Sequence, residues 1–72
     1  MIVYSNRCPK CKSMKSILNS KGILYTEVSD MNEIIRVATE MGTQELPLIT
    51  NAGENGNERY SGSSAVAFAR GL

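Results

Sequence analysis

Cys8 and Cys11 are the residues of this chain whose type and spacing best suit chemistry. They are its two cysteines, they enclose Pro9-Lys10, and the 72-residue sequence contains no histidine. Residues three apart are neighbours on a helix surface, and proline is favoured in the first helical turn. If Cys8 caps a helix that Pro9 opens, the two sulfur atoms can form and break a disulfide bond with little change in the backbone.

The predicted position of Cys8 favours a thiolate. Unpaired N–H groups and the helix dipole attract negative charge at a helix N-terminus, and Arg7, Lys10 and Lys12 add positive charge nearby. Cys11, one turn further on and on the apolar side, is expected to be less exposed and to keep an ordinary pKa. Cys8 is therefore the predicted attacking nucleophile, and Cys11 the predicted resolving thiol that displaces the product.

Three other roles of the pair stay open from spacing alone. A structural disulfide would close a very short loop and so restrict the unfolded chain little. A tetrahedral zinc site needs four ligands, which one Cys-x-x-Cys pair without histidine supplies only with carboxylates or a second subunit. The cysteines could also merely cap and fill a helix, although Cys8 between Arg7 and Pro9 is not in a pattern typical of burial.

The hydrophobic pattern predicts the elements that must position this pair. Ile2-Val3-Tyr4 is typical of a strand. Residues 9–21 have the pattern of an amphipathic helix that ends at Gly22, and residues 23–28 have the pattern of a second strand. In such a β-α-β unit the strands are parallel and the helix covers one face of the sheet. The pattern then predicts a helix over 31–41, a strand over 46–50, a turn over 51–57, a strand over 58–61 and a short helix after Gly62-Ser63-Ser64.

Each predicted helix has an apolar face with which to cover a sheet, and Asp30 with Glu33 forms a possible capping box for the second helix. The three apolar faces are Cys11, Met14, Ile17 and Leu18 in the first helix, Met31, Ile34, Ile35, Ala38 and Met41 in the second, and Ala65, Phe68, Ala69 and Leu72 in the third. The expected fold class is α/β, in the order β-α-β-α-β-β-α.

Length and composition narrow the class of protein. The chain is short enough to form one domain over residues 1–72, and its 42% apolar and 21% charged residues are ordinary for a folded protein. A net charge of +1 argues against a nucleic-acid partner, and no apolar run approaches the ~20 residues of a membrane helix. With no signal peptide visible, we expect a monomer in the cytoplasm. In that reducing compartment a close cysteine pair is more often catalytic or metal-binding than structural.

Three motifs in order resemble those of a minimal glutaredoxin. They are Cys8-Pro9-Lys10-Cys11 after the first strand, Leu46-Pro47 before a later strand, and Ser61-Gly62-Ser63-Ser64 before the last helix. The resemblance covers nearly the whole chain and implies a thioredoxin-like fold with a four-stranded mixed sheet and three helices. It also implies a cis peptide bond at Pro47, which lies against the active-site disulfide in that family, and a Leu46 backbone that pairs with a bound thiol or peptide.

The resemblance further implies a dithiol oxidoreductase that reduces protein or mixed disulfides, without a bound cofactor or metal. Ser63, Ser64 and Gln44 match positions that bind the carboxylates of glutathione in the family, and Arg7 and Lys10 could supply positive charge for the same substrate. Glu45, by contrast, would repel a carboxylate.

The electron source stays open between glutathione and a flavin-dependent thioredoxin reductase. The chain is similar in size to the glutaredoxin-like electron donors of ribonucleotide reductase, which depend on such a reductase. Two other classes are weighed as alternatives: a carrier of a [2Fe–2S] cluster, which needs four ligands from two subunits and glutathione, and a peptide-binding module on the same fold.

Overall fold

Three helices and four strands follow one another in the predicted order. The computed structural model describes all 72 residues. The elements are β1 (Ile2–Tyr4), α1 (Pro9–Ser20), β2 (Thr26–Val28), α2 (Met31–Met41), β3 (Leu48–Ala52), β4 (Glu58–Ser61) and α3 (Gly62–Arg70). The α/β class and the element order expected from the sequence are therefore confirmed. None of the helices has the length and apolar composition to cross a membrane.

The strands form one mixed sheet in the order β2-β1-β3-β4. β1 pairs in parallel with β2, where Val3 lies opposite Glu27, and antiparallel with β3, where Val3 lies opposite Ile49. β4 pairs antiparallel with β3. β1 is an inner strand of the sheet, and the chain passes from its C-terminal end into α1. Cys8 therefore lies just beyond the C-terminal end of an inner strand.

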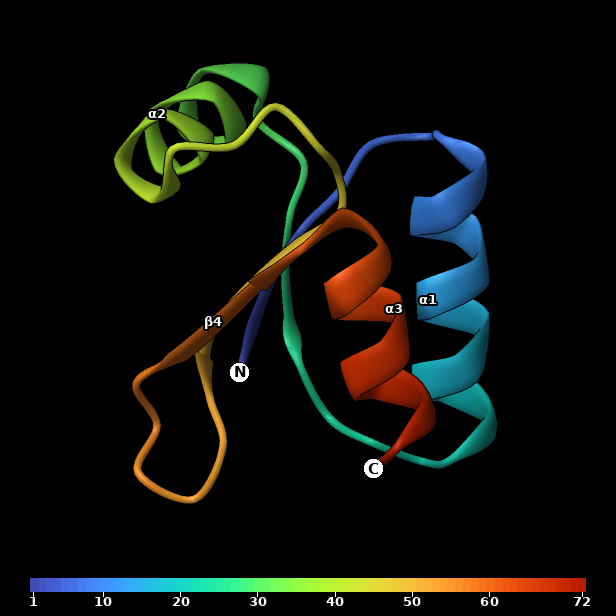
Figure 1. The fold of residues 1–72 in the computed structure, drawn as a ribbon. Helices are drawn as coiled ribbons and strands as arrows, with labels where there is room; N and C mark the ends of the chain where they lie inside the picture. The colour runs from blue at the N-terminus through green and yellow to red at the C-terminus, as the bar shows by residue number, and fades with distance from the viewer.

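Helices cover both faces of this sheet, with α1 and α3 side by side on one face and α2 on the other (Figure 1). Alternate residues of a strand point to opposite faces, so Val3 and Ile49 face α1 and α3, and Tyr4 and Leu48 face α2. Each face has its own buried cluster. The larger cluster, under α1 and α3, consists of Val3, Met14, Leu18, Ile49, Ala52, Ala65, Val66 and Ala69.

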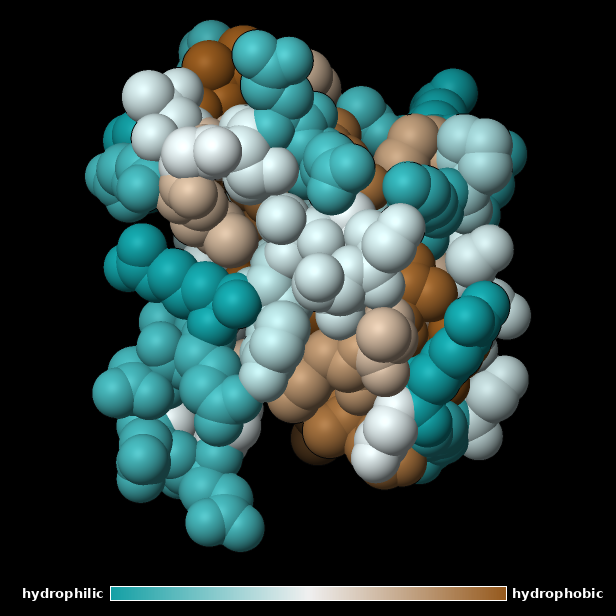
Figure 2. All heavy atoms as spheres, viewed as in Figure 1, coloured by the Kyte–Doolittle hydropathy of each residue, from teal (hydrophilic) through white to brown (hydrophobic).

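The surface view agrees with this layering. Hydrophobic atoms show where α3 lies against the rest of the molecule, and the turn between β3 and β4 projects from the body as a hydrophilic loop (Figure 2). Residues 53–59, which contain that turn, are all exposed. The structural core therefore lies among the helices and the sheet, away from the hairpin turn.

Two strands differ from the expected ranges. β2 contains only Thr26–Val28 instead of residues 23–28, because its partner β1 is itself three residues long. The N–H of Ile23 bonds instead to the Leu18 carbonyl at the end of α1, at 3.0 Å. β3 begins at Leu48 instead of residue 46 and extends to Ala52, since Pro47 has no N–H to donate to a neighbouring strand.

The helix faces also differ in part from expectation. α2 buries Ile34 and Val37 but leaves Met31 and Ile35 about half exposed, because it lies alone on its side of the sheet and only a narrow stripe is covered. Its N-cap Asp30 accepts the N–H of Asn32, whereas Glu33 pairs with Arg36, so only half of the expected capping box forms.

α3 lies against both α1 and the sheet, so its buried positions form a wider face that includes Val66. Phe68 is only half-buried and stacks on Tyr60, with 4.3 Å between the ring centroids. Leu72 lies beyond the end of the helix and is half exposed.

Candidate active site

Cys8 and Cys11 lie at the start of α1, as their spacing predicted. Cys8 is the N-cap residue in an extended conformation and Pro9 is in the first turn. The Cys8 sulfur accepts the backbone N–H of Cys11 at 3.2 Å. Both cysteines are free, Cys8 is partly exposed and Cys11 is fully buried. An accessible thiol and a buried thiol therefore stand one helical turn apart.

Asn6 completes this arrangement, and the sequence reasoning missed its role. Its Oδ1 accepts the backbone N–H of Cys8 at 2.8 Å and the thiol of Cys11 at 3.6 Å. The bond to the N–H two residues on is an Asx turn, which asparagine favours. Asn6 two positions before Cys8 is the sequence signal that could have revealed it.

The pKa of the Cys11 thiol is raised to about 11, first by burial and second by the hydrogen bond to the Cys8 side chain. The expectation of an ordinary pKa for Cys11 was therefore wrong. The physical reason is that the apolar face of α1 places this sulfur out of contact with water, where the charged thiolate is disfavoured. In the reduced protein Cys11 is a thiol across the neutral pH range.

An open cavity of about 420 Å³ lies beside Cys8. Its lining residues are Cys8, Pro9, Lys10, Gln44, Glu45 and Leu46. The structure therefore brings three of the predicted substrate-binding residues, Lys10, Gln44 and Leu46, to the same cavity as Cys8. Glu45, which the sequence marked only as repelling a carboxylate, also lines this cavity.

The Leu46–Pro47 peptide bond is cis, as the resemblance implied. Pro47 is fully buried, and its carbonyl accepts the N–H of Gly62 at 2.8 Å, which ties this loop to the start of α3. The N–H and C=O groups of Leu46 take part in none of the backbone hydrogen bonds of the chain. They are thus free to pair with an extended segment that enters the cavity.

The side chains of Ser63 and Ser64, at the start of α3, line two different hollows of the surface. Ser63 accepts a hydrogen bond from the Lys10 ammonium at 3.2 Å and lines a groove between α1 and α3. Ser64 lies instead in a different hollow, beside Arg59, Tyr60 and Met41. Neither is an N-cap, because α3 begins at Gly62 and its N-cap is Ser61. Of the two, only Ser63 forms a side-chain hydrogen bond with a residue that lines the Cys8 cavity.

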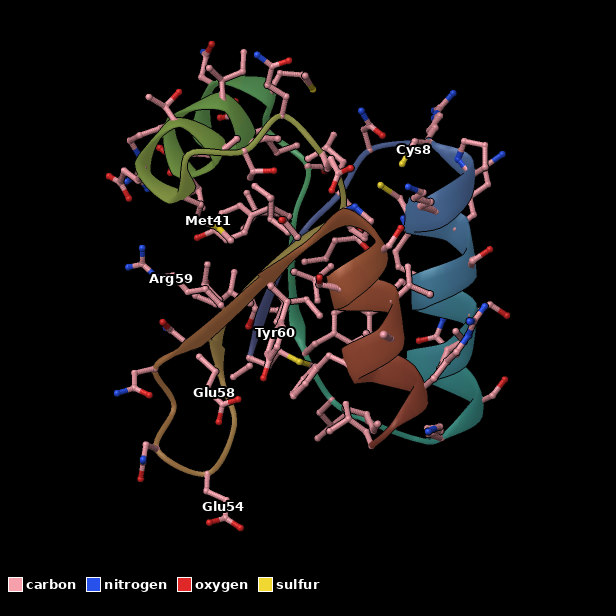
Figure 3. The ribbon with its side chains drawn as sticks, in the orientation of Figure 1. Cys8, Met41, Glu54, Glu58, Arg59 and Tyr60 are labelled. Atoms are coloured by element: carbon pink, nitrogen blue, oxygen red, sulfur yellow. The ribbon has the colours of Figure 1, made fainter.

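Positive charge gathers around Cys8. α1 and α3 run in the same direction, so their N-terminal ends, which carry the positive ends of the helix dipoles, lie at the same end of the molecule (Figure 1). Figure 3 shows Cys8 at that end, with Glu54 at the other. Arg7 is exposed and forms neither an ion pair nor a side-chain hydrogen bond. It contributes charge near the site, and no contact in the structure gives it a further role.

No three histidine, cysteine, aspartate or glutamate side chains lie together in a group that could hold a metal ion. No protein-family model, curated protein or solved structure matches this chain. The function proposed below therefore rests on the geometry of the site itself.

Proposed function

We propose that this protein is a glutaredoxin-like thiol–disulfide oxidoreductase that reduces protein or mixed disulfides through a reversible Cys8–Cys11 disulfide. The observation that carries the proposal is a partly exposed Cys8 sulfur that borders an open cavity and accepts the backbone N–H of Cys11, whose own thiol is buried behind it; the N···S distance is 3.2 Å. Cys8 can be reached by a substrate, and Cys11 can be reached by Cys8.

The first step is attack by the Cys8 thiolate on one sulfur of the substrate disulfide. The Cys8–substrate disulfide forms, the substrate S–S bond breaks, and the first thiolate leaves and takes a proton from solvent. The N-terminal ends of α1 and α3 favour the negative charge of the attacking sulfur. The free N–H and C=O groups of Leu46 are placed to hold the substrate backbone during this step.

The second step is attack by Cys11 on the Cys8 sulfur. Cys11 gives up its proton, the Cys8–Cys11 disulfide forms, and the second substrate thiolate is released, so the substrate gains two electrons that the protein loses. Part of the elevation of the Cys11 pKa comes from the Cys8 sulfur itself. That part disappears once Cys8 is bound in the mixed disulfide, so formation of the intermediate makes Cys11 easier to deprotonate.

The fold supports the same class of protein. The order β-α-β-α-β-β-α, the mixed four-stranded sheet, and the cysteines at the start of the first helix are what a thioredoxin-like fold requires. A further support is the loop with a cis Leu46–Pro47 bond, joined to α3 through the Pro47 carbonyl.

Replacement of each cysteine by serine tests the mechanism. The fully reduced protein is mixed with 2-hydroxyethyl disulfide, and the released thiol is measured together with the protein mass. Cys8→Ser should lower the rate by at least about 100-fold, since the thiolate is the nucleophile in this exchange and the remaining thiol, Cys11, is buried. Cys11→Ser should release one equivalent of thiol and accumulate a mixed disulfide on Cys8.

Ser16→Ala, at an exposed position of α1, is the matched control and should react like the parent protein. A Cys8→Ser protein that reacts at the parent rate would show the proposal to be wrong. The electron source is then determined by comparing re-reduction of the oxidised protein by glutathione with re-reduction by NADPH and a thioredoxin reductase.

A further inference from the structure

Glu45 is the one acidic residue among those that line the cavity beside Cys8. It forms no ion pair in the structure, whose salt bridges join Lys15 to Glu27 and Arg36 to Glu33 and Glu40. A substrate disulfide must enter this cavity to reach the Cys8 sulfur. The Glu45 carboxylate therefore acts on any charge that the entering group carries.

The Glu45 side chain is held close to the start of α3. A β-carbon added to Gly62 would lie 2.5 Å from Glu45 Oε2 and 2.8 Å from Glu45 Cβ. The side chain thus lies directly over Gly62, in space that any larger residue there would fill. Negative charge at this place is favoured by the N-terminus of α3, so the carboxylate has a physical reason to stay there.

Lys10 lines the same cavity but does not neutralise Glu45. Its ammonium donates to the hydroxyl of Ser63, which lines the groove between α1 and α3 and is not part of the Cys8 cavity. The stem of Lys10 therefore borders the cavity while its charge is turned towards the neighbouring groove. Among the residues that line the cavity, Glu45 is therefore the one whose charge has neither an ion pair nor a side-chain hydrogen bond, while the unpaired Arg7 lies outside the lining.

We propose that Glu45 is a specificity-determining residue, which makes the cavity beside Cys8 accept cationic and neutral disulfides in preference to anionic ones. The inference rests on the proposed disulfide chemistry and adds the charge class of its substrate. A polypeptide disulfide with a basic residue next to its cysteine fits this cavity. A small disulfide that carries carboxylates near its sulfur atoms is repelled.

Three small disulfides of similar size test this preference with the reduced protein in single-turnover reactions. They are cystamine, which is cationic, 2-hydroxyethyl disulfide, which is neutral, and 3,3′-dithiodipropionate, which is anionic. The quantity compared between variants is the ratio of the cystamine rate to the dithiodipropionate rate, so that the intrinsic reactivity of each disulfide cancels.

Glu45→Gln should lower this ratio about threefold to tenfold at low ionic strength, the range expected for one unit charge acting over a few ångströms at an exposed site. In about 1 M salt the difference between Glu45→Gln and the parent should vanish, because the Debye length falls to ~3 Å. A change in the reactivity of Cys8 itself cancels in the ratio, because both disulfides react with the same protein, and an unchanged urea-unfolding curve shows that the variant is folded. Lys10→Met should change the ratio less than Glu45→Gln.

Glu54→Gln removes the same charge at the other end of the molecule and is the matched control. The inference is overturned if Glu45→Gln changes the ratio no more than Glu54→Gln does, or if Lys10→Met has the larger effect. Failure of the parent protein to react with all three disulfides would instead overturn the proposed function, and the inference with it.

Discussion

At the scale of single residues, the two cysteines differ because α1 places them in different surroundings. Cys8 caps the helix and borders the open cavity, whereas Cys11 is on the buried face together with Met14 and Leu18. Residue type and spacing were enough to predict this difference. The rise in the pKa of the Cys11 thiol could not be predicted, because that pKa depends on how completely the sheet and α3 exclude water from one face of α1.

Asn6 carries a prediction at this scale. Asn6→Ala removes the acceptor of the Cys8 N–H and of the Cys11 thiol, so it should lower the free energy of unfolding by about 1 kcal/mol. It should also slow both steps of disulfide exchange, because the turn that positions the Cys8 sulfur is loosened. Urea unfolding of the reduced protein and the single-turnover thiol assay measure the two effects.

Asn6→Asp is the informative comparison, since it keeps an oxygen at the same reach. Compared with Asn6→Ala, we expect Asn6→Asp to restore the free energy of unfolding and the rate of attack by Cys8. It should slow the attack by Cys11, because a negative charge beside Cys11 disfavours its thiolate. An Asn6→Ala protein that is as stable and reacts as fast as the parent would show that these hydrogen bonds contribute neither to the stability of the fold nor to the rate of disulfide exchange.

At the scale of elements, the boundaries of α2, β1 and β4 could be predicted, because apolar periodicity and turn residues mark them locally. The extent of β2 could not, since it is set by the length of its partner β1 and not by residues 23–25 themselves. The rotation of α2, which exposes Ile35 while Val37 is buried, likewise depends on where the helix rests on the sheet. The site was predicted best where it is local in sequence, at Cys8 and Cys11, and least where distant loops meet, as with Glu45 over Gly62.

The start of α3 carries the prediction at this scale. Gly62 has a φ of +55°, and its Cβ position is filled by the Glu45 side chain. Gly62→Ala therefore combines an unfavourable backbone conformation with a steric clash and should lower the free energy of unfolding by about 1–3 kcal/mol. Thermal or urea unfolding measures the loss.

Gly22→Ala serves as its control, because Gly22 also has a positive φ but has no atom near its Cβ position. The loss at Gly62 should exceed the loss at Gly22, and the difference reports the clash with Glu45. Equal losses at the two glycines would show that Glu45 moves aside without cost.

At the scale of the whole molecule, the buried Cys11 thiol couples the stability of the fold to pH. The ordinary pKa of 9.0 applies in the unfolded chain, and the pKa in the folded protein is about 11. Below pH 9 the thiol is protonated in both states. Between about pH 9 and pH 11 the unfolded chain loses this proton and the folded protein keeps it, so the free energy of unfolding of the reduced protein should fall as pH rises.

Comparison with Cys11→Ala isolates this contribution, because the tyrosines and lysines that also titrate in the range are common to both proteins. Urea unfolding at several pH values should show a steeper loss for the parent than for Cys11→Ala. If the free energy of unfolding fell with pH at the same rate in both proteins between pH 9 and pH 11, the raised pKa of Cys11 would be contradicted.

The turn between β3 and β4 has a practical consequence. It projects from the end of the molecule opposite Cys8, and residues 53–59 are all exposed. Such a loop tip is where chains best tolerate added residues. A flexible tether inserted near Asn55 would attach the protein to a surface or to another domain with Cys8 facing away from the attachment point, which makes this turn the natural point for immobilisation or fusion.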